Sequence, residues 1–192
     1  STGYGLSAWQ RCGGGGVACR WGLHFDPSAL FASRRVASRP RVVWSDSRLT
    51  VLSTGASGGI GSVTAHLLLD QGGNVFAAAR RQGAMDSLQS RGAVVLPLDV
   101  ADAESREQLA AAVLERTGGQ LDALVNNAGY GEVGPMETMA LDRARSMFEV
   151  NVFGLMGLTQ LLLPAMRDRR RGGCVNGSSI AGRCAKPGGG WD

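Results

Sequence analysis

The sequence has few of the features that mark membrane, metal or disulfide proteins. Its 192 residues contain no uninterrupted apolar run of the about 18 residues that a transmembrane helix needs, so we expect no membrane span. The four cysteines (Cys12, Cys19, Cys174 and Cys184) show no CxxC spacing. We interpret them as reduced, unpaired thiols and expect no metal site, with a disulfide or zinc role as the alternative.

Net positive charge is absent outside the N-terminal 48 residues. Residues 1–48 contain seven arginines against Asp26 and Asp46, whereas residues 49–192 contain 13 basic and 14 acidic residues. The net charge of +4 therefore belongs to the N-terminal segment. This balance gives no reason to expect a nucleic acid partner for the remainder.

Residues 1–48 also lack sustained periodicity of either the strand or the helix type. The segment is rich in Gly, Arg, Ser and Trp, and Gly13–Gly16 form an uninterrupted run. We interpret it as a disordered or leader segment on a cytoplasmic protein. Its Arg-rich, acid-poor composition is also compatible with an organelle transit peptide.

From residue 49 onward, short apolar runs alternate with helical patterns, which is typical of βαβ units and a parallel sheet. The pattern predicts one α/β domain over residues 49–192. Right-handed crossovers predict the order 3-2-1-4-5 for five strands counted along the chain. We expect strands at 49–54, 74–79, 93–98, 121–126 and 174–178, and helices at 59–71, 83–90, 103–117 and 140–168.

The most informative motif is Thr54–Gly61, which reads Thr-Gly-Ala-Ser-Gly-Gly-Ile-Gly between an expected strand and an expected helix. Glycines allow a tight turn and a close backbone approach, and the helix N-terminus offers free N–H groups to phosphate. The context is that of a dinucleotide pyrophosphate site. We predict that it is formed by Gly55, Ser57, Gly59, Ile60 and Gly61.

Two arginines, Arg80 and Arg81, follow the second expected strand. The adenosine ribose of a dinucleotide should lie there, and an acidic residue would select NAD by binding the 2′-hydroxyl. Arginine instead pairs with a 2′-phosphate. These residues favour NADP over NAD, although two solvated arginines at a strand end would look the same.

Further motifs follow in register: Asp99-Val100, Asn126-Asn127-Ala128-Gly129, Asn151, and Ser178-Ser179-Ile180-Ala181-Gly182. Together with the glycine turn, this set resembles the short-chain dehydrogenase/reductase family over roughly residues 49–183. The stretches 126–137 and 148–154 look most like its 17β-hydroxysteroid and retinol dehydrogenase branch. The resemblance implies a Rossmann-type doubly wound sheet and hydride transfer between a nicotinamide cofactor and a small-molecule alcohol or carbonyl substrate.

The same resemblance assigns roles to individual residues. Asp99 corresponds to the residue that binds the adenine amine, with Val100 packing beside it. Asn127, Ala128 and Gly129 correspond to the backbone that passes the ribose, whereas we interpret Asn126 as a tie between strands. Ser179 corresponds to the catalytic Ser that binds the substrate oxygen. Asn151 corresponds to the Asn that helps to hold a proton-relay water.

The chain departs from the family at the catalytic Tyr and Lys, which the family carries as YxxxK after the Ser. No Tyr follows Ser179, the only tyrosines are Tyr4 and Tyr130, and Lys186 is not part of such a pattern. Strands six and seven of the family sheet have no counterpart either. We therefore expect an incomplete catalytic centre and an exposed sheet edge at 174–178.

Three interpretations remain open at this stage. The first is an NADP-dependent alcohol/carbonyl oxidoreductase, and the second is a non-catalytic dinucleotide-binding or interaction protein. The third is a non-functional fragment. In the first two, the long helix at 140–168 is a candidate surface for homo-oligomer formation.

Overall fold

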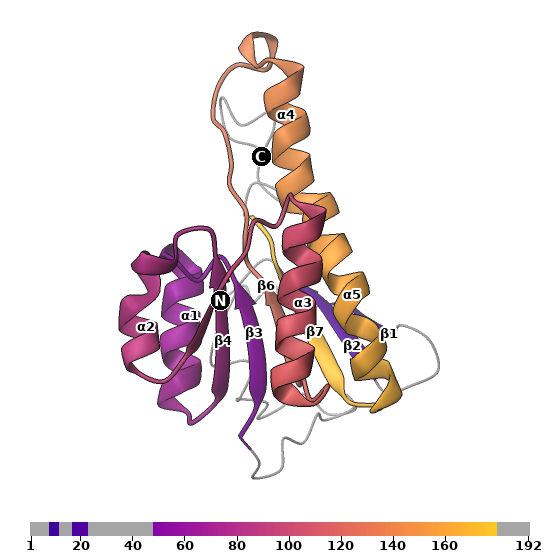
Figure 1. Cartoon of the computed structure of the whole chain (residues 1–192). Helices are drawn as coiled ribbons and strands as arrows, with labels where there is room; N and C mark the ends of the chain where they lie inside the picture. Colours follow the sequence, from indigo (N-terminus) through magenta and orange to yellow (C-terminus); the bar gives the residue numbers. More distant parts are fainter. Residues whose placement is uncertain (1–7, 12–16, 23–47, 180–192) are drawn as a thin grey trace, which may run out of the picture.

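The computed structural model describes residues 8–11, 17–22 and 48–179. In these ranges seven strands form one sheet, in the order β1-β2-β7-β6-β3-β4-β5 (Figure 1). The strands from β3 to β7 all pair in parallel, and their order counted along the chain is 3-2-1-4-5. The predicted topology is thus confirmed. The five strands are β3 (Thr50–Thr54), β4 (Asn74–Ala79), β5 (Val94–Pro97), β6 (Ala123–Asn126) and β7 (Gly172–Gly177).

The helices lie close to their predicted positions, with one interruption. The predicted continuous helix over 140–168 is divided by a π-helix in its middle. The helical elements are α1 (Gly59–Asp70), a 3-10 turn (Gln82–Met85), α2 (Asp86–Ser90), α3 (Ala103–Thr117), a 3-10 turn (Met136–Thr138), α4 (Leu141–Phe148), the π-helix (Glu149–Gly154) and α5 (Leu155–Asp168).

Two hydrophobic cores lie on the two faces of the sheet, because successive strand residues point to opposite sides. On β3, Leu52 packs in the core beneath α3 and α5, whereas Val51 packs in the core beneath α1 and α2. Figure 1 shows these two helix pairs over different parts of the sheet. Both faces are therefore covered, as expected for a doubly wound sheet.

Local signals explain the ends of α3. Asp102 accepts a hydrogen bond from the Ser105 backbone N–H at 2.8 Å, which makes it the N-cap of α3. Gly118 ends the helix with a φ of 58°, a left-handed conformation that glycine adopts without steric cost. Both residues match the boundaries expected from the sequence.

The edge of the sheet at β7 differs from our expectation. Two strands of the N-terminal segment, β1 (Ala8–Arg11) and β2 (Val17–Gly22), form an antiparallel pair, and β2 pairs in parallel with β7. The pairing runs from Val17 opposite Gly172 to Gly22 opposite Gly177. The predicted exposed edge was therefore wrong, because the free N–H and C=O groups of β7 pair with an extended segment far away in sequence. The remainder of residues 1–48, apart from Arg48, lies outside the described residues.

A buried carboxylate and two arginines form a cluster at the amino ends of the strands. The side chain of Asp122 is only 8% exposed and accepts a hydrogen bond from the Thr50 backbone N–H at 3.0 Å. Arg169 and Arg171 each approach the same carboxylate at 3.2 Å. This cluster connects β3 and β6 to the end of α5.

The segment Leu141–Asp168 is, within the described part of the chain, long and apolar enough to cross a membrane by length and composition alone. Its contacts in this structure are those of a core helix on one side, because Leu158, Leu162 and Met166 are fully buried against the sheet. The other side carries exposed apolar residues, and α4 projects beyond the sheet (Figure 1).

Candidate functional site

The turn between β3 and α1 leaves the start of the helix uncapped. Gly58 occupies the N-cap position without a side-chain hydrogen bond, and the first turn of α1 contains no acidic residue. The first N–H groups of a helix have no partner within the helix, and the helix dipole is positive at that end. The start of α1 therefore offers donors and positive potential to an anion.

The glycines of this turn have two different roles. A Cβ on Gly58 or Gly59 would meet no atom within 4 Å, so both positions face open space, and Gly59 has a φ of +52°. A Cβ on Gly61 would lie 2.3 Å from the Gly55 carbonyl oxygen. Gly58 and Gly59 thus keep space free beside the turn, whereas Gly61 allows α1 to pack against it.

Thr54, the first residue of the motif, joins the ends of the two central strands. Its hydroxyl oxygen accepts hydrogen bonds from the backbone N–H groups of Asn127 and Ala128, both at 3.0 Å. The Asn127 side chain in turn donates to the Thr54 carbonyl at 3.3 Å. The loop after β6 is therefore held against the glycine turn. Thr54 opens the motif, but no role was predicted for it from the sequence.

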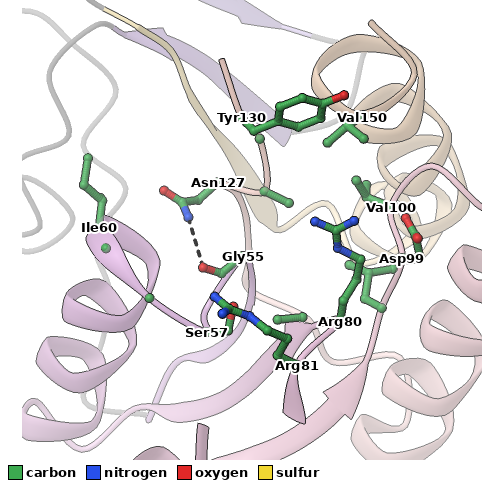
Figure 2. Close-up of a pocket in the computed structure, with 16 residues that line it drawn as sticks. Gly55, Ser57, Ile60, Arg80, Arg81, Asp99, Val100, Asn127, Tyr130 and Val150 are labelled. Carbon is green, nitrogen blue, oxygen red and sulfur yellow. Dashed lines mark hydrogen bonds between the residues drawn. The ribbon is translucent and has the colours of Figure 1, made fainter. Parts of the chain in front are cut away.

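A cavity of about 600 Å³ opens at this edge of the sheet (Figure 2). Every residue predicted from the sequence to bind the cofactor lines it, except Gly61, which lies beneath the turn. The lining residues are Gly55, Ser57, Gly58, Gly59, Ile60, Ala79, Arg80, Arg81, Leu98, Asp99, Val100, Asn127, Ala128, Gly129, Tyr130 and Val150. The individual roles of these residues stay predictions.

Arg80 and Arg81 leave the carboxyl end of β4 and enter the cavity from one side. In Figure 2, Arg81 lies near Ser57, while Arg80 lies near Asp99 and Val100. Both arginines are exposed, and neither forms an ion pair with any of the described residues. Two cationic groups are thus available beside the turn.

Asp99 and Val100 form the wall that follows β5. One oxygen of the Asp99 carboxylate accepts a hydrogen bond from the Ala101 backbone N–H at 3.1 Å. Because Asp102 caps α3, Asp99 is not needed as a helix cap. Val100 is 6% exposed and packs behind the cavity.

Asn151 does not line the cavity but holds a residue that does. Its side chain donates to the Tyr130 carbonyl at 2.7 Å and accepts from the Tyr130 N–H at 3.0 Å. Tyr130 and Val150 were both missed in the sequence analysis. A second hollow of about 400 Å³ adjoins the cavity at these two residues and extends to Ser146 and Glu149.

The other predicted catalytic residue, Ser179, is exposed at the carboxyl end of β7 and does not line the cavity. Asn126 has the structural role that we expected. Its amide donates to Asn176 at 2.9 Å and to the Thr159 hydroxyl at 3.0 Å, and so connects β6 to β7 and α5.

The family model described as short chain dehydrogenase matches residues 49–190. This chain belongs to the short-chain dehydrogenase family. It is 38% identical over 135 residues to the short-chain dehydrogenase cctT of Talaromyces islandicus, a match that covers 69% of this chain and 47% of that protein.

Solved structures of the short-chain dehydrogenase family give the same result. A short-chain dehydrogenase from Streptomyces avermitilis is 41% identical, with a TM-score of 0.71, over 74% of this chain and 53% of that one. The closed form of a serine dehydrogenase complexed with NADP+ is 31% identical, with a TM-score of 0.70, over 74% and 59%. The chain spans about half the length of the curated relatives that it matches.

Proposed function

We propose that this short-chain dehydrogenase binds NADP(H) in the cavity and is part of an oxidoreductase for alcohol and carbonyl substrates. The observation that carries the proposal is the convergence of Arg80 and Arg81 with the uncapped start of α1 on one cavity. NADP(H) carries a pyrophosphate and a 2′-phosphate, and the two features supply donors for both groups. The serine dehydrogenase with NADP+, which has the same fold, supports this choice of cofactor.

The cavity fits such a dinucleotide in shape as well as in charge. A side chain at Gly58 or Gly59 would fill the open space beside the turn. Because both residues are glycine, a phosphate has room to approach the backbone there. Asp99 uses one carboxylate oxygen within its own turn, which leaves the other for the adenine amine. When bound, NADP(H) would supply or accept the hydride of the reaction.

The test compares NADPH with NADH by isothermal titration calorimetry on the full chain. We expect NADPH to bind at least tenfold more tightly, because one hydrogen bond to a charged group contributes about 1.5–3 kcal/mol. Arg80→Ala and Arg81→Ala should each reduce that preference. Arg116→Ala, which removes an exposed arginine of α3 away from the cavity, is the matched control. Equal affinity for both cofactors would contradict the assignment.

We further propose that the catalytic centre of this chain is incomplete, because no YxxxK pair follows Ser179. A missing general acid/base alone typically costs about 10²–10⁴-fold in rate. We expect NADPH oxidation at background level with ketones, aldehydes and retinoids. Turnover that disappears in Ser179→Ala would refute this expectation. Binding without turnover would fit the alternative of a non-catalytic dinucleotide-binding protein.

The exposed side of the helices Leu141–Asp168 is the surface that we propose for self-association. It carries the apolar side chains Phe148, Val152, Phe153, Met156 and Leu161, each at least 36% exposed. Several exposed apolar side chains on one helical segment are typical of an interaction site. Gel filtration with light scattering tests this proposal. We expect the wild-type chain to form a dimer or larger species and Phe153→Asp to lose it.

We propose that residues 17–22 remain part of the working protein. Cleavage of a transit peptide that includes β2 would remove the partner of β7. This pairing argues that residues 17–22 are retained in the working protein.

A further inference from the structure

The first turn of α3 holds the loop that carries Asp99 and Val100. The Asp99 backbone N–H donates to the Ser105 hydroxyl oxygen at 2.9 Å. The guanidinium of Arg106 donates from Nη1 to the Val100 carbonyl at 2.7 Å. Two successive residues of α3 thus restrain two successive residues of the cavity wall.

Arg106 has an unfavourable environment for a cation. Its Nε is buried without a hydrogen-bond partner, and no carboxylate among the described residues pairs with it. A Cβ on Gly157 would lie 2.8 Å from this Nε, so the guanidinium lies directly over the backbone of α5. The Arg106 side chain as a whole is only partly buried, so the free-energy cost is confined to its Nε, which has left water without gaining a hydrogen bond. The hydrogen bond that the structure gives Arg106 is directed at the Val100 carbonyl, in the wall of the cavity.

The Val100 carbonyl also lies close to the π-helix Glu149–Gly154. A Cβ on Gly154 would lie only 2.2 Å from this oxygen, so the end of the π-helix lies in close contact with it. The same π-helix carries Val150, which lines the cavity as Val100 does. The position of the Val100 carbonyl therefore affects how Val100 and the π-helix lie beside each other in the lining of the cavity.

We propose that Arg106 is a positioning residue for the adenine side of the cavity. It does not line the cavity and acts through the Val100 carbonyl, which it holds between α3 and the π-helix. This inference rests on the proposed function, namely that the cavity binds NADP(H). The affinity for the adenosine half of NADP(H) then depends in part on Arg106, which does not line the cavity.

The experiment measures NADPH affinity by calorimetry and thermal unfolding without ligand, both on the full chain. Arg106→Met removes the hydrogen bond but keeps the length of the side chain. We expect the dissociation constant for NADPH to rise on the order of tenfold. The variant removes a hydrogen bond from a charged group, so the Val100 carbonyl and the cavity wall beside it lose a restraint. The melting temperature should change little, since Arg106 is only partly buried and forms no ion pair with any described residue.

Two further variants test the mechanism. Arg106→Lys keeps a cationic donor and should recover most of the affinity. Gly157→Ala places a methyl group against Nε, should displace the guanidinium from the other side, and should weaken binding as Arg106→Met does. Arg116→Met, on the exposed face of the same helix, is the matched control and should change neither measurement.

Each outcome decides the proposal. Unchanged NADPH affinity in Arg106→Met, or no recovery by Arg106→Lys, would overturn it while leaving the proposed function intact. A fall in melting temperature that accompanies the loss of affinity, or loss of cooperative unfolding, would show that Arg106 is needed for the fold instead. Failure of the wild-type chain to bind NADPH would overturn both the inference and the proposed function.

Discussion

Replacement of Gly61 by alanine should destabilise the protein even though alanine is the better helix former. Gly61 lies in the first turn of α1, at a position that any residue could adopt by its backbone angles. The added Cβ would lie 2.3 Å from the carbonyl oxygen of Gly55 and 2.5 Å from Nδ2 of Asn127. The Gly55 oxygen belongs to the backbone, so it cannot rotate away as a side chain would.

The balance of two effects gives the expected size. Alanine is favoured over glycine in a helix interior by about 1 kcal/mol. A carbon normally approaches an oxygen no closer than about 3.3 Å, so the new contact overlaps by about 1 Å. Overpacking of this kind costs about 1–3 kcal/mol and occasionally more. We therefore expect a net loss of up to about 2 kcal/mol in the free energy of unfolding, together with a displaced glycine turn.

Urea denaturation followed by circular dichroism measures this loss. Gly58→Ala is the matched control three residues earlier, because its φ of 174° is extended and its Cβ would meet no atom within 4 Å. We expect that control to change stability by about 0.5 kcal/mol or less. Our reasoning fails if Gly61→Ala is as stable as the wild type, or if both variants lose the same amount.

Two further predictions concern the cavity and the opposite end of the sheet. Gly59→Val should abolish dinucleotide binding in a protein that still folds. The valine side chain would enter the open space beside the turn, at a residue with a φ of +52°. Calorimetry with NADPH measures the binding, and binding retained by the variant would contradict the prediction. Asp122→Ala should lower the free energy of unfolding by about 3 kcal/mol, because it leaves Arg169 and the Thr50 N–H without their buried partner. Asp142→Ala, which removes an exposed ion pair with Arg145, should cost about 0.5 kcal/mol or less, and similar losses in both variants would contradict the role of burial.

Local signals explain why most of the fold could be predicted. The strand at 74–79 and the helix at 103–117 were predicted at their observed boundaries, because glycines and the Asp102 cap mark them in the sequence. The glycine turn between β3 and α1 was predicted for the same reason, since all of its residues are contiguous.

Other features depend on contacts that no local pattern shows. The π-helix at Glu149–Gly154 occurs where Gly154 meets the Val100 carbonyl, and nothing in the residues around it signals that contact. Tyr130 and Val150 reach the cavity through the Asn151 hydrogen bonds and this π-helix, so neither could be predicted from its neighbours.

The pairing of β2 with β7 also has a consequence for the order of folding. During synthesis, the residues of β2 leave the ribosome early, whereas β7 is made only after all the other described strands. The edge of the sheet therefore cannot close until nearly all of the described chain is present, and its closure brings together segments from opposite ends. Contacts of such long sequence separation are typically slow to form, and an unpaired extended segment is prone to aggregate until they do. The N-terminal segment thus passes through a long interval in which other chains compete with β7 for its hydrogen bonds.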